Sequence, residues 1–325
     1  MKRIVVTGGL GQIGSELVLR LRELYGADHV LATDIRAVED HAVCRSGAFA
    51  TVDVLDAQGL FRVARDHRAD AVIHLAALLS ATAEANPVSA WNLNMGGLMN
   101  VLEMARELKC QVFVPSSIGS FGPGTPRVRT PQDTIQRPTT IYGVSKVAGE
   151  LLCDYYHHKY GVDARGVRFP GLVSHVAPPG GGTTDYAVEI YEGAIAKGRY
   201  TSYIAKGTYL DMMYMPDAVE AVIRLMEADP ARLIHRNAFN ITAMSVDPEA
   251  IAAAIRRHLP DFALDYRVDP VRQAIAENWP DAIDATCAAR EWGFSAAYGL
   301  DRMTADMLEK LAQKRSLAHR PQEVQ

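Results

Sequence analysis

The run TGGLGQIG near the start of the chain constrains its fold more than any other feature. Gly8, Gly11 and Gly14 lie directly between an apolar segment over residues 3–6 and an amphipathic segment over residues 12–24. This pattern predicts a strand, a turn and a helix, with the glycines suited to a tight turn, a close backbone approach to phosphate, and close helix–strand packing. The amino terminus of such a helix presents free amides to a pyrophosphate. The spacing differs from the common G-x-G-x-x-G, so the position between strand and helix carries the prediction of a dinucleotide site.

Apolar segments and helical patterns alternate through the first half of the chain. Strands are predicted over residues 3–6, 30–34, 49–52, 71–73, 112–114 and 164–169. Helices are predicted over residues 12–24, 56–67, 87–108 and 140–160. Apolar strands separated by helices indicate an α/β fold with a doubly wound parallel sheet, the Rossmann arrangement. Ligands of such sheets bind beyond the carboxyl ends of the strands. Residues at these ends are Gly8, Asp34, Asp53, Ala76 and Ser117.

The pattern changes after residue 170, which predicts two parts. Residues 1–170 are expected to form the dinucleotide-binding Rossmann domain, and residues 171–325 mainly a small substrate-side lobe, with segments that return to the Rossmann sheet. The Pro- and Gly-rich residues 174–185 predict a mobile loop over the site. Further helices are predicted near residues 185–197, 215–228, 246–258 and 300–314, and a sheet-edge strand near residues 239–241. The polar tail from about Arg315 is expected to fray.

Composition excludes several classes of protein. A hydrophobic content of 48% with 22% charged residues fits a globular protein, and a net charge of −4 gives no reason to expect a nucleic-acid partner. The four scattered cysteines form no C-x-x-C, so neither a metal site nor a disulfide framework is predicted. No apolar stretch is long enough to span a membrane. Glycines interrupt the first apolar run too early for a signal peptide, and we expect a cytoplasmic protein.

Three segments beyond the glycine run are candidates for cofactor contacts. Asp34 lies 20 residues past Gly14. A carboxylate there accepts hydrogen bonds from ribose hydroxyls and repels a 2′-phosphate, which favours NAD over NADP. Arg36 is a competing signal, because it can meet a phosphate or stack on adenine, or simply be a solvated loop charge. Asp53-Val54 is expected to border the adenine, with a loop cap as the alternative for Asp53. Leu75-Ala76-Ala77 offers small residues where the backbone passes close to the cofactor.

The spacing Tyr142-x-x-x-Lys146 predicts alcohol chemistry. Oxidation of an alcohol needs a group that accepts the hydroxyl proton. A lysine one helical turn after a tyrosine lies on the same face, and its charge favours the phenolate form of that tyrosine. Lys146 can also reach the nicotinamide ribose, and Ser117 can orient the reacting oxygen. A chance pair on a helix surface is the alternative, but the motif follows a strand that ends in serines, which favours the catalytic interpretation.

These segments resemble the extended short-chain dehydrogenase/reductase family. The resemblance covers nearly the whole chain and is carried by TGGLGQIG, HLAA (His74 to Ala77), PSSIGSFG (Pro115 to Gly122) and YGVSK. It implies NAD, a Ser/Tyr/Lys catalytic set of Ser117, Tyr142 and Lys146, and often a homodimer built on two long helices. Ser117 rather than Ser116 matches the catalytic serine of the family, and Asn94 matches an asparagine near the cofactor ribose. The full set of expected cofactor contacts is Gly8, Gly11, Gln12, Ile13, Gly14, Asp34, Ile35, Arg36, Asp53, Val54, Leu75, Ala76, Ala77, Asn94, Tyr142, Lys146 and Phe169.

Two departures distinguish the chain from the nucleotide-sugar epimerases of that family. Epimerases commonly carry R-Y-F-N where this chain has residues 168–171, RFPG. They also carry an arginine, which holds a diphosphate, where this chain has Leu210. A smaller substrate is therefore expected. The segments HLAALLSATAEANP, RFPGL and GGGTTDYAVEIYE are similar to the branch that oxidises the β-hydroxyl of L-threonine with NAD, giving 2-amino-3-oxobutyrate. That resemblance implies substrate contacts from Ser80, Ser117, Tyr142, Gly180 and Thr184.

Two other functions stay open at this point. One is an NAD-dependent epimerase or reductase of nucleotide sugars, which Leu210 and Pro170 disfavour. The other is a non-catalytic NAD-binding sensor, which the intact set of Ser117, Tyr142 and Lys146 disfavours. His74, Trp91 and the pair Met212-Met213 are expected to serve core or interface packing.

Overall fold

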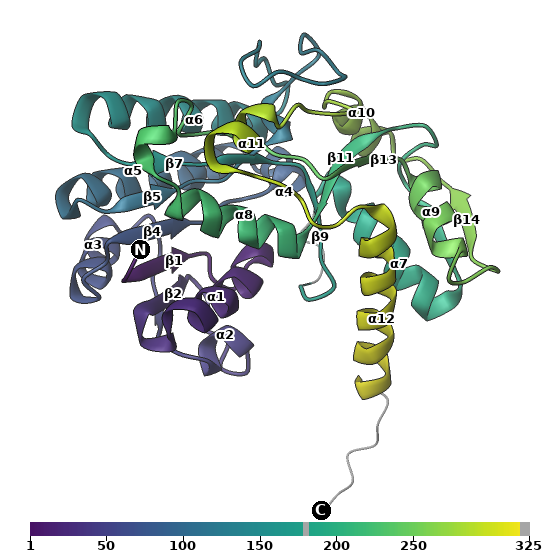
Figure 1. Cartoon of the computed structure of the whole chain (residues 1–325), viewed down its shortest axis with the longest axis horizontal. Coiled ribbons are helices and arrows are strands. Elements are labelled where there is room, and N and C mark those ends of the chain that lie inside the picture. The colour runs from purple at the N-terminus through teal and green to yellow at the C-terminus, as the bar shows by residue number, and fades with distance from the viewer. Residues whose placement is uncertain (178–181, 319–325) are drawn as a thin grey trace, which may run out of the picture.

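A parallel six-stranded sheet forms the centre of the first half of the chain (Figure 1). The computed structural model describes residues 1–177 and 182–318. The strand order is β3-β2-β1-β4-β5-β7, and every neighbouring pair is parallel. The strands are β1 (Ile4–Thr7), β2 (Val30–Asp34), β3 (Phe49–Thr51), β4 (Ala71–His74), β5 (Gln111–Phe113) and β7 (Ala164–Arg165). The order reverses between β1 and β4, which confirms the predicted doubly wound α/β fold.

Helices cover both faces of this sheet because successive strand residues point to opposite sides. On one face, Ile4, Val6, Ile73 and Phe113 pack in a core shared with α1 (Gln12–Tyr25) and α8 (Met215–Glu227). On the other, Val5, Val72 and Val112 pack in a core shared with three helices. These are α3 (Ala57–Asp66), α5 (Pro87–Leu108) and α6 (Ile141–Tyr160). The short helices α2 (Ala42–Arg45) and α4 (Ser80–Ala85) complete the first half of the chain.

Two predicted strands are each divided in the structure. The strand predicted over residues 164–169 breaks at Gly166 into β7 and β8 (Val167–Phe169), and β5 is followed after Pro115 by β6 (Ser116–Ser117). A β-carbon at Gly166 would collide with the Val114 carbonyl oxygen. The segments around Gly166 and Val114 therefore lie too close together for a side chain at residue 166. The order β12-β8-β6 places β12 (Phe239–Asn240) at an edge, as predicted.

The second lobe contains strands that the sequence analysis did not predict. A three-stranded sheet has the order β13-β11-β9, and β10 pairs in parallel with β14. The strands are β9 (Gly171–Val173), β10 (Arg199–Ser202), β11 (Leu210–Tyr214), β13 (Met244–Val246) and β14 (Ala263–Tyr266). The helices are α7 (Tyr186–Lys197), α9 (Pro248–Arg256), α10 (Pro270–Glu277) and α12 (Leu300–Ala318). Helix α11 (Thr286–Trp292) instead packs through Ala288 and Trp292 in the core that contains Ile4 and Phe113.

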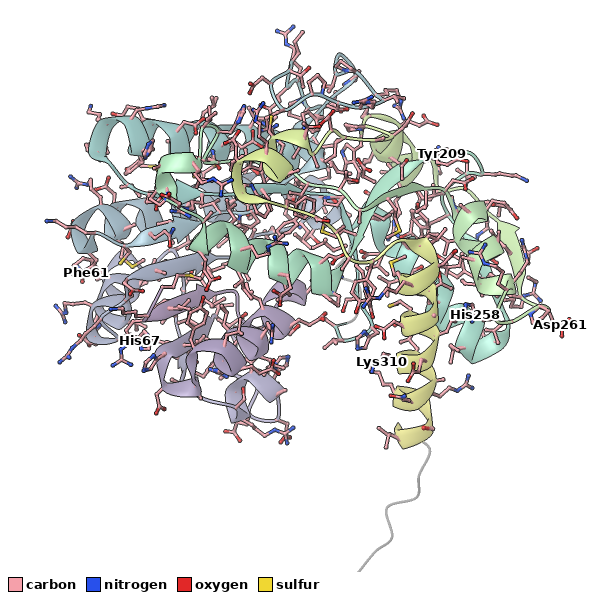
Figure 2. The ribbon with its side chains drawn as sticks, viewed as in Figure 1. Phe61, His67, Tyr209, His258, Asp261 and Lys310 are labelled. Atoms are coloured by element: carbon pink, nitrogen blue, oxygen red, sulfur yellow. The ribbon has the colours of Figure 1, made fainter. Side chains whose placement is uncertain are left out.

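The side chains labelled in Figure 2 mark opposite ends of the molecule. Phe61 and His67 lie at the end formed by α3, while Tyr209, His258 and Asp261 lie on the second lobe and Lys310 lies on α12 (Figure 2). Of the tail expected to fray from about Arg315, residues 319–325 lie outside the described residues, while α12 continues to Ala318 and Arg315 donates a hydrogen bond to the Ile195 carbonyl. Among the described residues, no helix is both long and apolar enough to cross a bilayer.

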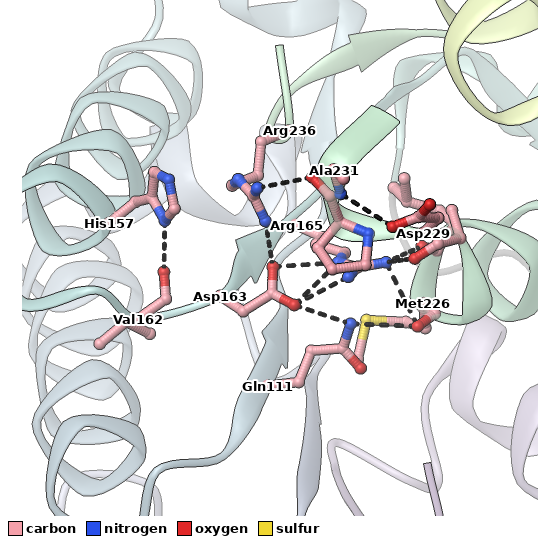
Figure 3. Close-up of polar contacts among 12 residues, drawn as sticks. Gln111, His157, Val162, Asp163, Arg165, Met226, Asp229, Ala231 and Arg236 are labelled. Atoms are coloured by element: carbon pink, nitrogen blue, oxygen red, sulfur yellow. Dashed lines mark hydrogen bonds and ion pairs between the residues drawn. The ribbon is translucent and has the colours of Figure 1, made fainter. Parts of the chain in front are cut away.

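A buried arginine ties β7 to the end of α8 (Figure 3). Arg165 is 1% exposed, and its guanidinium donates to the Leu225 and Ala228 carbonyls at 2.6 and 2.7 Å. The last carbonyls of a helix have no partner within the helix, so this contact caps α8. Asp163 pairs with Arg165 at 2.8 Å and with Arg236 at 2.6 Å (Figure 3). The charge of Arg165 is thus compensated while the helix is fixed against the sheet.

Candidate active site

The glycine turn forms a backbone cradle at the amino end of α1. Gly8 has φ +68°, and a β-carbon there would lie 2.7 Å from the Ala76 nitrogen. A β-carbon at Gly14 would collide with the Gly8 carbonyl oxygen, so Gly14 serves helix–strand packing. Gly11 is the N-cap of α1, and no side chain caps the helix. The free amides and the absence of β-carbons fit the pyrophosphate of a dinucleotide.

A cavity of about 320 Å³ continues from the cradle along the ends of β2 and β3. It brings together ten of the predicted cofactor contacts: Gly8, Gly11, Asp34, Ile35, Arg36, Asp53, Val54, Leu75, Ala76 and Ala77. Asp34 is held in place because Oδ2 accepts from the Leu10 amide at 3.1 Å and Oδ1 accepts from Arg36 at 3.2 Å. Arg36 is 63% exposed, so it is a surface partner of Asp34. The cavity has the shape and the carboxylate expected for the adenosine half of NAD.

Two predicted cofactor contacts make structural hydrogen bonds. Asp53 borders the cavity, and its Oδ1 also accepts from the Leu55 amide at 2.9 Å, which is the loop cap considered as the alternative. Asn94 bonds through its side-chain amide to both the nitrogen and the oxygen of Leu78, at 2.8 and 3.2 Å. It does not line the adenosine cavity but a smaller one that Lys146 also borders. Asn94 thus fixes the loop after β4 beside Lys146.

The three predicted catalytic residues meet in a second cavity of about 140 Å³, which also contains Ser80 and Thr184. Ser117, at the end of β6, accepts a hydrogen bond from the Gly119 amide at 3.1 Å. A β-carbon at Gly119 would lie 3.2 Å from the Tyr142 ring and 3.4 Å from Ser117 Oγ, so both flank this glycine. The predicted cofactor contacts Gln12, Ile13 and Phe169 line this cavity too.

Helix α6 sets the positions of Tyr142 and Lys146. Thr140 caps its amino end by accepting from the Gly143 amide at 3.1 Å, which places Tyr142 in the first turn. Lys146 follows one turn later, with Nζ 5.3 Å from the centre of the Tyr142 ring. The ammonium also donates to the Pro115 carbonyl at 2.8 Å. A positive charge is therefore fixed beside the phenol.

His74 is buried near Lys146 and is uncharged. Burial, and secondarily the charge of Lys146, lowers the pKa of His74 to about 3. Its Nδ1 lies 2.8 Å from the hydroxyl of Thr7, so the ring joins β4 to β1. The expectation that His74 serves packing is confirmed.

Other residues singled out from the sequence lie away from the chemistry. Leu210, Met212 and Met213 are completely buried. Leu210 belongs to the core of the second lobe, so its position carries no cation for a diphosphate. Trp91 on α5 is 40% exposed, which rules out core packing in this chain and leaves the interface interpretation. Gly180 lies outside the described residues.

The structure adds residues to the cavity that the sequence analysis missed. Trp279, just after α10, and Asp185, before α7, both line it. Asp185 accepts from the Gly182 amide at 2.8 Å, which shapes the loop beside Thr184. Asp185 falls within residues 174–185, the loop that was predicted to cover the site. The loop prediction could therefore have indicated Asp185 as a cavity residue. Trp279 belongs to no predicted element, and only long-range packing brings it to the cavity.

An open cradle for a pyrophosphate, a ribose carboxylate and a Tyr/Lys/Ser cavity define an NAD-dependent oxidoreductase. The chain belongs to the NAD dependent epimerase/dehydratase family, whose pattern matches residues 4–242, and it is of the extended short-chain type with NAD as cofactor. An uncharacterized epimerase/dehydratase of Staphylococcus aureus is 60% identical over 97% of this chain and 98% of its own.

Several solved structures that are similar to the chain carry the name threonine dehydrogenase. The X-ray structure of L-threonine dehydrogenase from Clostridium difficile is 59% identical, with a TM-score of 0.95 over 97% of this chain and 98% of its own. A monomeric L-threonine 3-dehydrogenase from a metagenome is 41% identical, with a TM-score of 0.91 over 96% of this chain and 99% of its own.

Proposed function

We propose that this protein is an L-threonine 3-dehydrogenase, which oxidises the β-hydroxyl of L-threonine to give 2-amino-3-oxobutyrate and NADH. The observation that carries the proposal is the convergence of Ser117, Tyr142 and Lys146 on one small cavity beside the glycine cradle. A cavity of about 140 Å³ suits an amino acid better than a nucleotide sugar, and the buried Leu210 provides no anchor for a diphosphate. The named activity of relatives at 59% identity supports the same substrate.

Each catalytic residue has a distinct role in this proposal. Bound NAD supplies the hydride acceptor at C4 of its nicotinamide. Tyr142, as phenolate, takes the hydroxyl proton of threonine while a hydride leaves the β-carbon that bears this hydroxyl. The C–H and O–H bonds thus break as the carbonyl forms. Lys146 stabilises the phenolate and reaches the ribose hydroxyls. Ser117 donates a hydrogen bond to the reacting oxygen and orients it. The hydroxyls of Ser80 and Thr184 bind the polar groups of the amino acid.

Substrate comparison tests the proposal. NADH absorbance is measured with L-threonine, L-allo-threonine and L-serine, and UDP-galactose is tested in parallel for conversion to its epimer. We expect the highest kcat/KM with L-threonine and no change in UDP-galactose. Absence of NADH from all three amino acids would remove threonine oxidation from consideration. Epimerisation would then support the nucleotide-sugar alternative, and NAD binding without turnover of either class would support the sensor.

The Asp34→Asn variant tests the choice of cofactor. The carboxylate is fixed by the Leu10 amide, and its replacement by a neutral carboxamide removes the charged acceptor for the ribose and the repulsion of a 2′-phosphate while weakening the contact with Arg36. We expect kcat/KM for NAD to fall by about 10-fold or more, since a hydrogen bond to a charged group contributes ~1.5–3 kcal/mol, and turnover with NADP to become measurable. Asp53→Asn is the matched control, with a smaller effect because its carboxylate caps Leu55. Equal effects of the two variants would contradict the role of Asp34.

We further propose a homodimer built on α5 and α6. Exposed apolar side chains recur on one face of each helix, at Val88 and Trp91 of α5 and at Val144, Leu151 and Tyr155 of α6. Apolar stripes of this size on neighbouring helices are typical of subunit interfaces.

Light scattering coupled to size exclusion measures the mass in solution. We expect a dimer that Leu151→Glu converts to a monomer, because the carboxylate would be desolvated in the interface. Val271→Glu, on an exposed apolar residue of α10, is the control and is expected to stay dimeric. A monomeric native chain, the state named for the metagenome relative, would contradict the proposal.

A further inference from the structure

A cluster of metal-ligand types lies outside the catalytic cavity. Cys287 and Glu291 of α11 and His235 of the loop before β12 each offer one donor atom, and all three atoms lie within 4.8 Å of one another. Phe239, which follows His235 by four residues, pairs with Val167 at the amino end of β8. The catalytic cavity lies at the other end of β8, where Phe169 lines it. The cluster, named here the α11 cluster, therefore lies outside the lining of the catalytic cavity.

Helix geometry explains how these residues come together. Cys287 and Glu291 are four residues apart, so they lie on the same face of α11 one turn apart. His235, 56 residues before Glu291 in sequence, faces them with Nδ1 2.5 Å from Glu291 Oε1. Tetrahedral Zn²⁺ with N, O and S ligands places its donors about 3.3–3.6 Å apart, given metal distances of ~2.0–2.3 Å. His235 Nδ1 and Glu291 Oε1 need to separate by about 1 Å to reach that spacing, and all three donor atoms already lie within 4.8 Å of one another.

Both of the harder ligands already have supporting partners. His235 turns its second ring nitrogen, Nε2, toward the Asp133 carboxylate at 3.3 Å. Glu291 uses its second oxygen, Oε2, to accept from the Ile234 and His235 amides at 2.6 and 3.0 Å. Metal-bound histidines almost always donate their other N–H to a carboxylate, and metal-bound carboxylates are themselves hydrogen-bonded. The ring and the carboxylate are thus oriented, and the donor atoms Nδ1 and Oε1, which bond to each other, lie within 4.8 Å of the Cys287 sulfur.

The charge around the cluster is mostly negative. Burial raises the pKa of the Cys287 thiol, and although Arg290 opposes this, the carboxylates of Glu291, Asp133 and Asp284 raise it further. Glu291 is 3% exposed. The nearby cations are Arg290, whose guanidinium lies 3.8 Å from Glu291, and Arg129, which pairs with Asp284 at 3.4 Å. Their side chains are 63% and 82% exposed, so both can turn away into solvent. A dication placed among these groups would relieve their repulsion.

We propose that Cys287, Glu291 and His235 bind one Zn²⁺-class dication, with the fourth position open to water. Binding would replace the thiol proton of Cys287 and the hydrogen bond between His235 and Glu291. Because the ligands belong to α11 and to the loop before β12, the ion would tie α11 to the sheet edge at β12. Its role would be structural, and it does not depend on the proposed function.

Cobalt titration of the full-length, chelator-treated protein tests the site. Co²⁺ bound by a thiolate gives a charge-transfer band in the near ultraviolet. We expect a saturable band at one Co²⁺ per chain, displaced by Zn²⁺ and lost in Cys287→Ser. Cys44→Ser is the matched control and is expected to keep the band, because Cys44 is also partly exposed but lies outside the cluster. No band in the native chain, or the same band in Cys287→Ser, would overturn the proposal.

A thermal measurement separates lost binding from lost folding. The unfolding midpoint is expected to rise with added Zn²⁺ in the native chain and in Cys44→Ser, and to be insensitive to Zn²⁺ in Cys287→Ser and Glu291→Gln. Without metal, all these variants are expected to unfold cooperatively and to bind NAD. A midpoint that rises equally with Zn²⁺ in Cys287→Ser would place the metal elsewhere and refute the α11 cluster. Turnover with threonine reports on the active site alone, so either proposal can fail without the other.

Discussion

Replacing Tyr142 by phenylalanine is expected to lower kcat by about 10²–10⁴-fold, the usual contribution of a positioned acid or base. The phenol is the group in the catalytic cavity that lies beside both Ser117 and the ammonium of Lys146. Phenylalanine keeps the ring and its packing against Ala83 and Ala90 but cannot accept the proton. NAD affinity should change little, because the pyrophosphate and adenosine sites are separate from the hydroxyl. Steady-state NADH formation and a fluorescence titration with NADH measure the two quantities.

Tyr160→Phe is a suitable control for this variant. Tyr160 is the last residue of the same helix and is partly exposed. It does not line the catalytic cavity, so this variant should retain native turnover. Substantial activity in Tyr142→Phe, with NAD still bound, would sink the assignment of Tyr142 as the base. Loss of activity in both variants would show that the helix, not the hydroxyl, had been disturbed.

The second large effect is expected for Gly8→Ala. The new methyl group would sit 2.7 Å from the Ala76 nitrogen and 2.9 Å from the Leu75 carbonyl carbon, in a backbone with φ +68°. The left-handed conformation costs about 1–2 kcal/mol for a residue with a β-carbon, and overpacking against backbone adds about 1–3 kcal/mol. We expect the free energy of unfolding to fall by about 2–5 kcal/mol and NAD binding to be lost or strongly weakened. Urea denaturation and NADH titration measure both.

Gly198→Ala separates backbone strain from collision. Gly198 has φ +65°, almost the value at Gly8, but a β-carbon there would meet no atom within 4 Å. We expect the free energy of unfolding of Gly198→Ala to fall by about 1–2 kcal/mol and its NAD affinity to stay native. If Gly8→Ala were no more destabilising than Gly198→Ala and still bound NAD, the close approach of β1 to the loop after β4 would not be a requirement of the cradle.

The Rossmann half was predictable because its signals are local. The glycine run, the apolar strands and the spacing of Tyr142 and Lys146 each fall within one short segment. The second lobe gave weaker signals, because strands such as β9 and β13 have three residues each and pair with segments far away in sequence. Two predicted strands are interrupted, at Gly166 and at Pro115. The close approach of Gly166 to the Val114 carbonyl appears only when the two segments are packed together.

The same distinction applies to the sites. Ser80 and Thr184 were found through resemblance, and the structure brings both to the cavity. Trp279 was missed because it lies in a segment without periodic pattern, and only the packing of the second lobe brings it there. The α11 cluster was missed for a related reason, since a single cysteine, a glutamate and a distant histidine form no local motif.

The adenosine cavity and the catalytic cavity adjoin different hydrophobic cores. The adenosine cavity is lined by residues up to Leu93, on the sheet whose core contains Ile4 and Phe113. Thr184 and Trp279 instead reach the catalytic cavity from the lobe whose separate core contains Tyr186 and Leu210. Substitutions in the core of Tyr186 and Leu210 are therefore expected to reshape the catalytic cavity, through Thr184 and Trp279, more than the cavity around Asp34. A change of substrate can thus begin in side chains that contact neither the alcohol nor the cofactor.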